Sequence, residues 1–515
     1  MNRRGAVAVG VLIAWAAGLA MFLRRERAEA PARRLAEAAM RVAPGGTYYR
    51  VERNGRHVGY ASSTVDTAQS GFSIVDYLVA DVAAGGSNHR VTAQSDVRLT
   101  RRLELAEFAL GFEADSAPID VTGRVLGDSL VAFSISHGAG SQPDSHRVRI
   151  EGPILLPTIV PLVLALGEEL AVGQQFSLAT FDPTVPGTRP MGVRVAAESL
   201  FTVSDSAMLD ASTGRWVSAH SDTVRAFQLA SDGPTSFRGW VDRQGRLVAV
   251  EQALGFSLHR TAYEEAFENW RLDATSGATE SAGNDLLTET AISAGALDAV
   301  RNRQRLTVRL SGLDTSRYEL GGGRQHWSGD TLTITREDSS AMAADWTRPA
   351  TGAFRRRYRS ALAAEPLLER DAPEIRALAV RLTSDTRDPA VAARRLLQWV
   401  HDSLEKRVTV TVPSARQVLA ARAGDCNEHA QLYVALARAA GIPSRVVAGV
   451  AWVNGRFYYH AWPEVLLNDW VAVDPTFGQF PASASHIRLV RGGLASQAEL
   501  VRLMGRMRLD VIGSP

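Results

Sequence analysis

The stretch Arg422-Ala-Gly-Asp-Cys-Asn-Glu-His-Ala-Gln-Leu-Tyr433 decides the interpretation of this chain, because it holds the only cysteine among the 515 residues. After Cys426, apolar residues recur at helical spacing until Gly441 and Pro443 end the pattern. Asp425 is a suitable N-cap, which would place Cys426 in the first turn of a helix. The unpaired amides and the positive end of the helix dipole favour a thiolate, so this position predicts a lowered pKa and a reactive thiol. A cysteine that is simply buried is the alternative.

Two downstream segments offer a base and a group that orients it, the partners that a thiol nucleophile needs. Residues 444–453 have a strand pattern and are followed by Asn454-Gly455, a tight-hairpin signal, so the return run with His460 should pair with them. A second turn leads into the run that carries Asp474. Facing positions on neighbouring antiparallel strands lie about 4.5 to 5.5 Å apart at Cβ, so an imidazole N–H of His460 could reach the Asp474 carboxylate.

Other residues near these segments are candidates for the same site. Gln417 could supply an oxyanion-hole amide, His429 could be a rival base or a pocket residue, and Trp462 could wall a cleft for an acyl group. Each also has a structural alternative: a polar residue of a loop or helix, a side chain on a nearby helix face, and an aromatic ring packed beside a sheet. Zinc coordination by Cys426, His429 and His460 is a further alternative. With one cysteine, an intramolecular disulfide and a multi-cysteine zinc site are excluded, and we expect no metal and no cofactor.

Upstream, from about residue 46 to 271, apolar and polar residues alternate in short runs that end at turn signals such as Asn54-Gly55. This pattern predicts a large antiparallel sheet, curved or closed. Helical patterns dominate only in the C-terminal third, so the predicted fold class is α+β. The predicted divisions are an N-terminal anchor at 1–30, an antiparallel β-domain at 31–274, a linker at 275–285, a small β-region at 286–363 that leads into the catalytic domain, and a catalytic α+β domain at 364–515.

Residues 5–23 form a run of 19 without a charge, which is long enough to cross a bilayer as one helix. A cleavable signal peptide is the alternative, but charged residues at 24–27 follow the run where small residues would be needed. We expect an uncleaved transmembrane helix with the soluble part extracytoplasmic, and therefore periplasmic, although arginines on both sides leave a cytoplasmic orientation open. The formal net charge of +2 gives no basic excess, so we expect no nucleic-acid partner.

Four separated blocks, at residues 424–426, 436–445, 460–464 and 470–476, resemble the transglutaminase-like superfamily, which has a papain-like cysteine fold. The resemblance covers roughly residues 371–490. It implies that Cys426 is the nucleophile, His460 the general base and then acid, and Asp474 the group that orients the imidazole. Glu464, also in these blocks, is either a partner of this site or part of a salt bridge. The upstream β-region is similar to domains of bacterial membrane-anchored members, and no role comes with that similarity.

The resemblance implies thiol-dependent acyl transfer on a peptide or amide bond through a thioester on Cys426. We expect hydrolysis by a peptidase or amidase of the cell envelope, acting on a peptide or protein substrate. Protein cross-linking by a transglutaminase is the alternative within the same chemistry. A non-catalytic binding or scaffold protein of the envelope is the alternative of a different class. The sequence carries no signature of a particular substrate, and it leaves the oligomeric state open.

Overall fold

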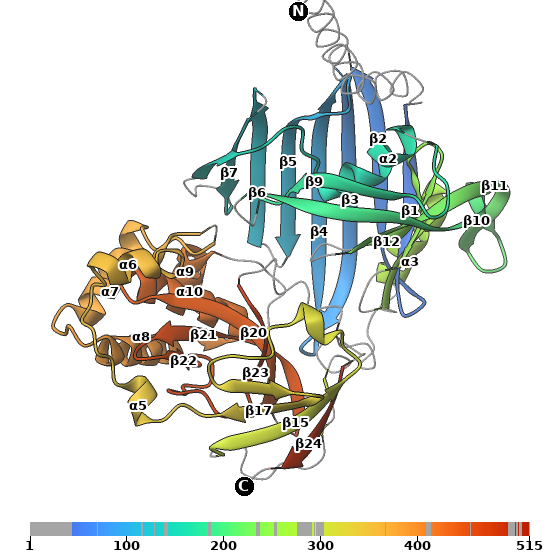
Figure 1. Cartoon of the computed structure of the whole chain (residues 1–515). Helices are drawn as coiled ribbons and strands as arrows, with labels where there is room; N and C mark the ends of the chain where they lie inside the picture. Colours follow the sequence, from blue (N-terminus) through green and yellow to red (C-terminus); the bar gives the residue numbers. More distant parts are fainter. Residues whose placement is uncertain are drawn as a thin grey trace, which may run out of the picture.

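The computed structural model describes residues 44–513 apart from gaps, the longest of which are 276–290, 295–302, 408–413 and 493–499. Figure 1 shows a large sheet domain and, below it, a part in which helices pack on smaller sheets. The predicted membrane segment at 5–23 and nearly all of the predicted linker lie outside the described residues. Among the described residues, no helix is long and apolar enough to cross a bilayer.

One antiparallel sheet dominates the N-terminal part, which confirms the expectation drawn from the alternating pattern. It has 14 strands in the described part of the chain, and the pairing of β1 with β14 joins two meanders, β1–β8 and β9–β14. The edge strands are β8 and β9, so the sheet is curved but open. The strands are β1 (Gly45–Arg53), β2 (Arg56–Ala68), β3 (Gly71–Ala84), β4 (Ser87–Thr100), β5 (Leu105–Ala114), β6 (Ala117–Leu126), β7 (Leu130–Ser136), β8 (Asp144–Arg149), β9 (Gln175–Phe181), β10 (Thr188–Asp210), β11 (Arg215–Asp232), β12 (Arg238–Asp242), β13 (Leu247–Glu251) and β14 (Phe256–Thr261).

The sheet folds back over itself, so that β9 and β10 cross in front of β3–β7, with helix α2 (Val160–Gly167) between these layers (Figure 1). Inward side chains of both layers and of α2 form one apolar core, to which Phe108, Phe133, Phe181 and Leu229 contribute. This part ends with a second, short helical segment. It consists of a π-helix at Glu264–Glu268 followed by α3 (Asn269–Thr275). The burial of one face explains the alternating pattern of the strands.

Side-chain caps start four helices of the C-terminal part, whereas the helices Gly352–Arg357 and Pro373–Thr383 begin without one. The side chain of Asp388 accepts hydrogen bonds from two backbone amides and starts α8, which Pro389 favours at its first position. Apolar stripes of these helices pack around α10 in one core. The helices are α5 (Ser339–Met342), α6 (Gly352–Arg357), α7 (Pro373–Thr383), α8 (Pro389–Ser403), α9 (Ala415–Ala421) and α10 (Cys426–Ala439).

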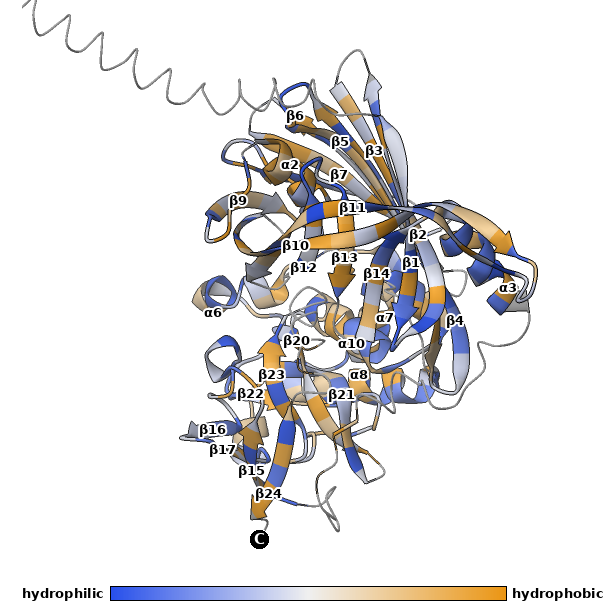
Figure 2. Cartoon of the chain, turned by 90° about the vertical axis from the view of Figure 1, so that its right-hand side faces the viewer, coloured by the Kyte–Doolittle hydropathy of each residue, from blue (hydrophilic) through white to orange (hydrophobic). Residues whose placement is uncertain are grey.

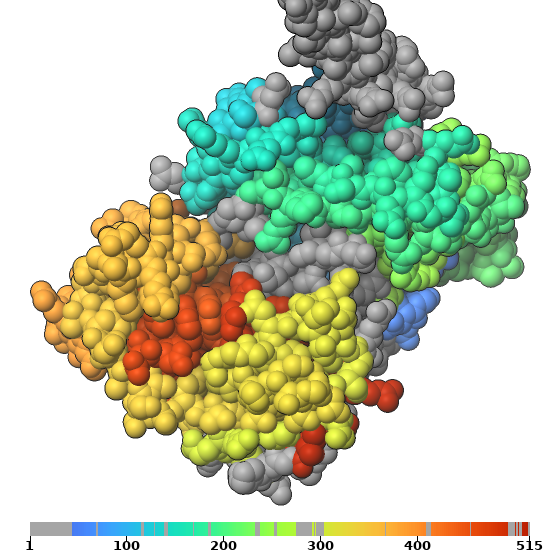
Figure 3. All heavy atoms as spheres, viewed as in Figure 1, coloured from blue at the N-terminus to red at the C-terminus, as the bar shows by residue number. Residues whose placement is uncertain are grey.

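Two four-stranded sheets lie beside these helices. The sheet that α10 covers has the order β22-β21-β20-β23, and the smaller sheet has the order β16-β17-β15-β24. Figure 3 shows the red surface of the former region between the orange helical segment and the yellow segment of the smaller sheet. The strands are β15 (Arg305–Ser311), β16 (Gln325–Ser328), β17 (Thr331–Thr335), β20 (Ser444–Val453), β21 (Arg456–Leu466), β22 (Trp470–Ala472), β23 (Ile487–Arg491) and β24 (Arg508–Gly513), with the short parallel pair β18 (Glu405–Lys406) and β19 (Ala423–Gly424).

The smaller sheet is completed by the far end of the chain, since β24 pairs with β15 in antiparallel register. The predicted division at residue 363 therefore cuts through one sheet. Buried residues of this sheet, such as Leu306 and Ile334, also share a core with Ala448 and Ile487 of the neighbouring sheet. The two sheets consequently form one packed unit around the α10 region.

A buried ion-pair network ties these two sheets together at Glu464 of β21. Its carboxylate accepts from Arg445 at 2.5 Å and from Arg488 at 2.7 Å, and Arg488 also donates to the carbonyl oxygens of Gly321 and Gly322. Burial alone would raise the pKa of Glu464, but the two guanidinium groups offset it and hold the pKa below its ordinary value. Glu464 thus forms a salt bridge, the second of the two interpretations that the sequence left open.

Glu464→Gln should lower the free energy of unfolding by about 3–5 kcal/mol, because it leaves the buried guanidinium of Arg488 and the partly exposed one of Arg445 without their anion. The depressed pKa means that this stabilisation is present above the unfolded-state pKa of about 4.3 and is lost as the pH falls below it. Urea denaturation at pH 7 and pH 4 measures both effects, and the variant should lose less stability on acidification than the wild type.

Glu319→Gln is the matched control, since Glu319 pairs with Arg491 while its side chain is 47% exposed. Exposed pairs contribute about 0–1 kcal/mol. Equal losses in the two variants would contradict the role assigned to Glu464.

Candidate active site

Cys426 is the first residue of α10, and the sequence around it fixes that start. The Asp425 side chain accepts from the backbone N–H of Asn427 at 2.8 Å, and the Glu428 carboxylate accepts from the Asp425 N–H at 2.9 Å, which completes a capping box. Gly424 is needed for close approach, because a Cβ there would lie 2.4 Å from the Cβ of Glu428. The predicted N-cap is therefore confirmed, and Glu428 adds a capping role that the sequence reasoning missed.

The thiol lies against the backbone of β21. The N–H of Ala461, the residue directly after His460, donates a hydrogen bond to it, and α10 packs on β20 and β21. One edge of β21 pairs with β20, and the other edge pairs with β22 only at residues 464–466. The second edge is therefore open near residue 461, where the start of α10 lies. The beginning of α10 and the histidine strand therefore meet at the sulfur.

The electrostatic surroundings of this thiol differ from the expectation based on the helix dipole. Burial and the nearby carboxylates of Asp425, Glu428 and Asp474 raise the pKa of Cys426 well above its ordinary value, and only the Ala461 hydrogen bond acts in the opposite direction. The predicted lowering of the pKa is thus wrong in direction. The thiol is therefore neutral, and a nucleophilic role would require a base that takes its proton.

Asp474 is fully buried and organises the imidazole groups of the site. Its Oδ2 accepts from Nε2 of His460 at 2.8 Å and from Nε2 of His486 at 2.8 Å, while its Oδ1 accepts from the N–H of Phe477 at 3.0 Å. Burial would raise the pKa of Asp474, but the two histidines offset this and lower it below the ordinary value. Since Nε2 of His460 donates to the carboxylate, Nδ1 is the nitrogen that remains for accepting a proton.

Aromatic rings fix the plane of the His460 imidazole. The Phe477 ring stacks on it with a centroid distance of 4.7 Å and an interplanar angle of 6°, and the Trp462 ring lies nearby at 6.0 Å and 21°. Trp462 is 0% exposed, so it packs behind His460 and does not wall an open cleft as predicted. Its contribution to the site is to hold the imidazole in one orientation.

Two further predicted residues serve the helix starts. The amide oxygen of Gln417 accepts from the Ser414 N–H at 2.8 Å and completes the capping box of α9, so this side chain serves the start of that helix. His429 is buried, and its Nδ1 donates to the carbonyl oxygen of Asp425 at 2.7 Å. Burial lowers the pKa of His429, so its ring is neutral and its Nε2 is a buried acceptor with no partner in the described chain.

His486 is the residue of this cluster that the sequence did not reveal. It is 1% exposed, its Nδ1 lies 3.1 Å from Oγ of Ser483, and its ring meets Trp462 edge-on at 5.1 Å. Burial lowers the pKa of His486 despite the neighbouring carboxylate, so the ring is a neutral donor to Asp474. A lone histidine twelve residues beyond Asp474 carries no periodicity or spacing signal, and only the folded chain brings it there.

Metal ligation was the remaining alternative for these side chains. Among the described residues, two groups of three could hold an ion: His460, Asp474 and His486, and the exposed group Asp205, His220 and Asp222. Neither contains Cys426, so the zinc set predicted as an alternative is not assembled. In the buried group both Nε2 atoms donate to one carboxylate oxygen, and these hydrogen bonds account for the arrangement.

Comparison with known proteins gives one family match. The family model of the transglutaminase-like superfamily matches residues 376–475, which contain α10, β21 and Asp474. No curated protein sequence matches the chain. Two similar solved structures are a candidate cysteine protease from Cytophaga hutchinsonii (16% identity, 41% of this chain and 85% of that chain, TM-score 0.28) and a candidate protease from Parabacteroides distasonis (11% identity, 74% and 69%, TM-score 0.19). At such TM-scores the two structures carry no further argument.

The neutral thiol can be tested by alkylation with iodoacetamide across pH, since Cys426 is the only cysteine. We expect a midpoint above the reference of about 8.5. The double variant Asp425→Asn/Glu428→Gln keeps residues that cap well but removes the negative charge of the pair, so its midpoint should fall. A wild-type midpoint below the reference would mean that the helix dipole outweighs burial, contrary to our assignment.

His486 should act as a positioning residue through Asp474. In His486→Leu the carboxylate loses one of its two imidazole donors, so the hydrogen bond that it accepts from Nε2 of His460 should strengthen and the resonance of that proton should move downfield. Proton NMR of ¹⁵N-labelled histidines measures this shift, with His460→Gln identifying the signal. His486→Gln, whose amide can still donate, should restore the wild-type resonance; an unchanged resonance in His486→Leu would leave His486 a packing role only.

Proposed function

Residues 376–475 form a transglutaminase-like domain, and from this premise we propose that the protein is a thiol-dependent hydrolase of peptide or amide bonds. The observation that carries the proposal is the meeting of three groups. Cys426 starts α10 with its sulfur at the Ala461 backbone, and the adjacent His460 donates from Nε2 to the buried Asp474. We assign Cys426 as nucleophile, His460 as base and acid, and Asp474 as the group that orients the imidazole.

The first half of the reaction forms a thioester. Nδ1 of His460 takes the thiol proton while Sγ of Cys426 attacks the carbonyl carbon of the amide, and the tetrahedral intermediate carries the negative charge on oxygen. The imidazolium then gives this proton to the leaving amine as the C–N bond breaks, which leaves the acyl group on sulfur. Because the resting thiol is neutral, proton transfer accompanies the attack.

Stabilisation of the oxyanion falls to the start of α10. The Asp425 side chain uses the amides of Asn427 and Glu428 for capping, whereas the Cys426 N–H has no acceptor in the described chain. We assign that N–H as the oxyanion donor, in place of Gln417. One such donor typically contributes about 2.7–4 kcal/mol to lowering the barrier.

The second half of the reaction depends on the acceptor. Water activated by Nδ1 of His460 releases a carboxylic acid and restores the thiol, whereas an amine would give a cross-linked or transamidated product. We favour water because it needs no acceptor site of its own. We further propose that the catalytic part acts on the extracytoplasmic side of a membrane, as residues 5–23 predict, with a peptide or protein as substrate.

A peptide library digested from whole bacterial proteins, incubated with the enzyme and biotinylated pentylamine, tests this function by mass spectrometry. Hydrolysis yields new peptide termini or conversion of side-chain amides to acids, and transamidation yields peptides that carry the amine. We expect hydrolysis products in the wild type and their loss by at least about 10³-fold in Cys426→Ala, because nucleophile and base act as a unit.

Asp474→Asn is the informative second variant. The NH2 group of the amide can donate to Nε2 of His460, which would place the ring proton on Nδ1 and remove the base. It should retain binding and lose most turnover. Products that are equal in wild type and Cys426→Ala would overturn the enzyme assignment and leave the scaffold function, while amine-carrying products alone would establish transamidation.

A further inference from the structure

A cavity of about 500 Å³ lies inside the N-terminal sheet domain, far along the chain from Cys426. Its floor is formed by β1–β5, its roof by α2 and its side by the turn between β12 and β13. Figure 2 shows that α2 is mostly hydrophobic. The volume falls within the range of about 300–1,000 Å³ that is typical of small-molecule sites.

Apolar side chains make up most of the lining. The apolar residues of the floor include Val65, Ile74, Leu78 and Ala93. The roof contributes Ile159, Leu162 and Leu166.

The roof is held at a fixed distance by Gly245 in the β12–β13 turn. Gly245 has φ +78°, and a Cβ there would lie 2.6 Å from the Cα of Leu162. The turn and α2 are thus in direct backbone contact, so the cavity is part of the packed structure.

A row of polar side chains crosses the middle of this apolar floor. Thr47, Ser63, Asp76 and Ser95 are register partners on four neighbouring strands and all line the cavity. Ser63 donates to Asp76 at 2.6 Å, and the Thr47 hydroxyl donates to the backbone of Ser63. The Ser95 hydroxyl, on a residue only 8% exposed, has no hydrogen-bond partner in the described chain.

A buried polar atom without a partner is destabilising, so this row favours a ligand that brings its own hydrogen-bonding group. Burial raises the pKa of Asp76, with the Ser63 hydrogen bond offsetting part of the effect. An anionic ligand group would lose its hydration beside this carboxyl group, since Arg246, a cation of the lining, is already paired with Asp242.

We propose that this cavity is a binding site for an uncharged, largely apolar molecule that carries one hydroxyl or amide group, placed against Asp76 and Ser95. The site is separate from the proposed active site and independent of it. It gives the N-terminal domain a ligand-binding role.

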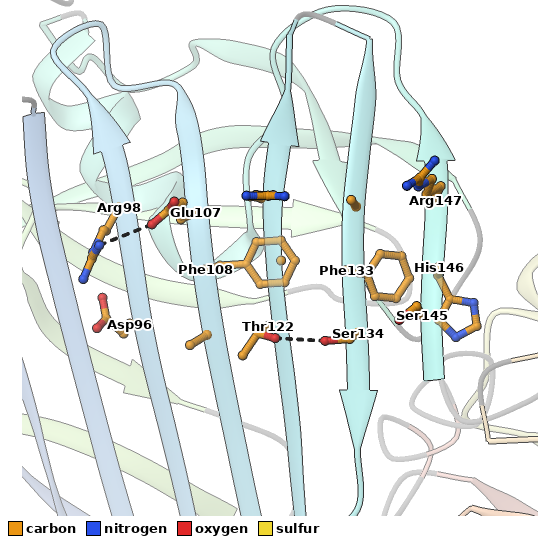
Figure 4. A pocket seen from close by; sticks show the side chains of 14 residues that line it. Asp96, Arg98, Glu107, Phe108, Thr122, Phe133, Ser134, Ser145, His146 and Arg147 are labelled. Atoms are coloured by element: carbon orange, nitrogen blue, oxygen red, sulfur yellow. Dashed lines mark hydrogen bonds and ion pairs between the residues drawn. The ribbon is translucent and has the colours of Figure 1, made fainter. Parts of the chain in front are cut away.

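The opposite face of the same sheet provides a contrast. Over β4–β8 it carries an open, polar hollow in which Arg98 pairs with Glu107 at 3.3 Å and Thr122 bonds Ser134 at 3.0 Å (Figure 4). Most of its lining side chains are polar, and two pairs of them bond each other, so the apolar cavity is the better site for an uncharged, largely apolar ligand.

N-phenyl-1-naphthylamine is a suitable probe, because it is uncharged and apolar and has a single N–H. Fluorescence titration of the full chain should show saturable binding of one molecule per chain. 8-anilino-1-naphthalenesulfonate, which has the same rings plus a permanent charge, should bind at least tenfold more weakly and should not displace the first probe.

Ala93→Phe fills the floor of the cavity and should weaken binding of the uncharged probe by at least tenfold. Ala132→Phe is the matched control, because Ala132 lines the polar hollow on the opposite face. This substitution adds the same aromatic ring outside the cavity. Ser95→Ala is a smaller change that replaces Ala93→Phe in the test if the latter does not fold. It should weaken binding about fivefold.

Thermal melting and alkylation of Cys426 report that each variant is folded. Equal affinities of wild type, Ala93→Phe and Ser95→Ala, or equal binding of the two probes, would overturn the proposal and indicate a non-specific apolar surface.

Discussion

The Asp474 carboxylate is the interaction on which the proposed active site depends. A fully buried anion is costly unless hydrogen bonds replace its hydration, and here two imidazole N–H groups and one backbone N–H do so. This requirement brings together β21, the segment after β22 and the segment before β23. The carboxylate therefore fixes which nitrogen of His460 carries a proton and where the other one points, before any substrate arrives.

The surroundings of the thiol follow a different principle. A capping box needs carboxylates at the start of α10, and those same carboxylates oppose ionisation of Cys426. The start of α10 therefore positions the sulfur at the Ala461 backbone but does not favour the thiolate. It also leaves the Cys426 N–H without an acceptor in the described chain. In the proposed mechanism, reactivity comes from proton transfer to His460, which couples attack on the substrate to the protonation of the imidazole.

Ion pairs and apolar packing both stabilise the C-terminal part. Glu464 follows His460 and Trp462 on the same face of β21 and binds Arg445 and Arg488, of which Arg488 also reaches Gly321 and Gly322 beside the smaller sheet. Trp462 packs against His460 itself. β24 closes the smaller sheet with residues from the end of the chain. The proposed site is thus supported by segments that are up to about two hundred residues apart in sequence.

Local patterns in the sequence determined much of this molecule. Alternation of apolar and polar residues is a direct consequence of burying one sheet face, so the large antiparallel sheet was predictable, and the Gly-Asp-Cys stretch and the Asn-Gly turn predicted α10 and the β20–β21 hairpin because caps and turns depend on nearby residues. Only the tertiary structure decided the place of His486, the fully buried position of Trp462, the pairing of β24 with β15 and the raised pKa of Cys426. Each of these depends on burial and on charges brought close by distant segments, and no short-range pattern records them.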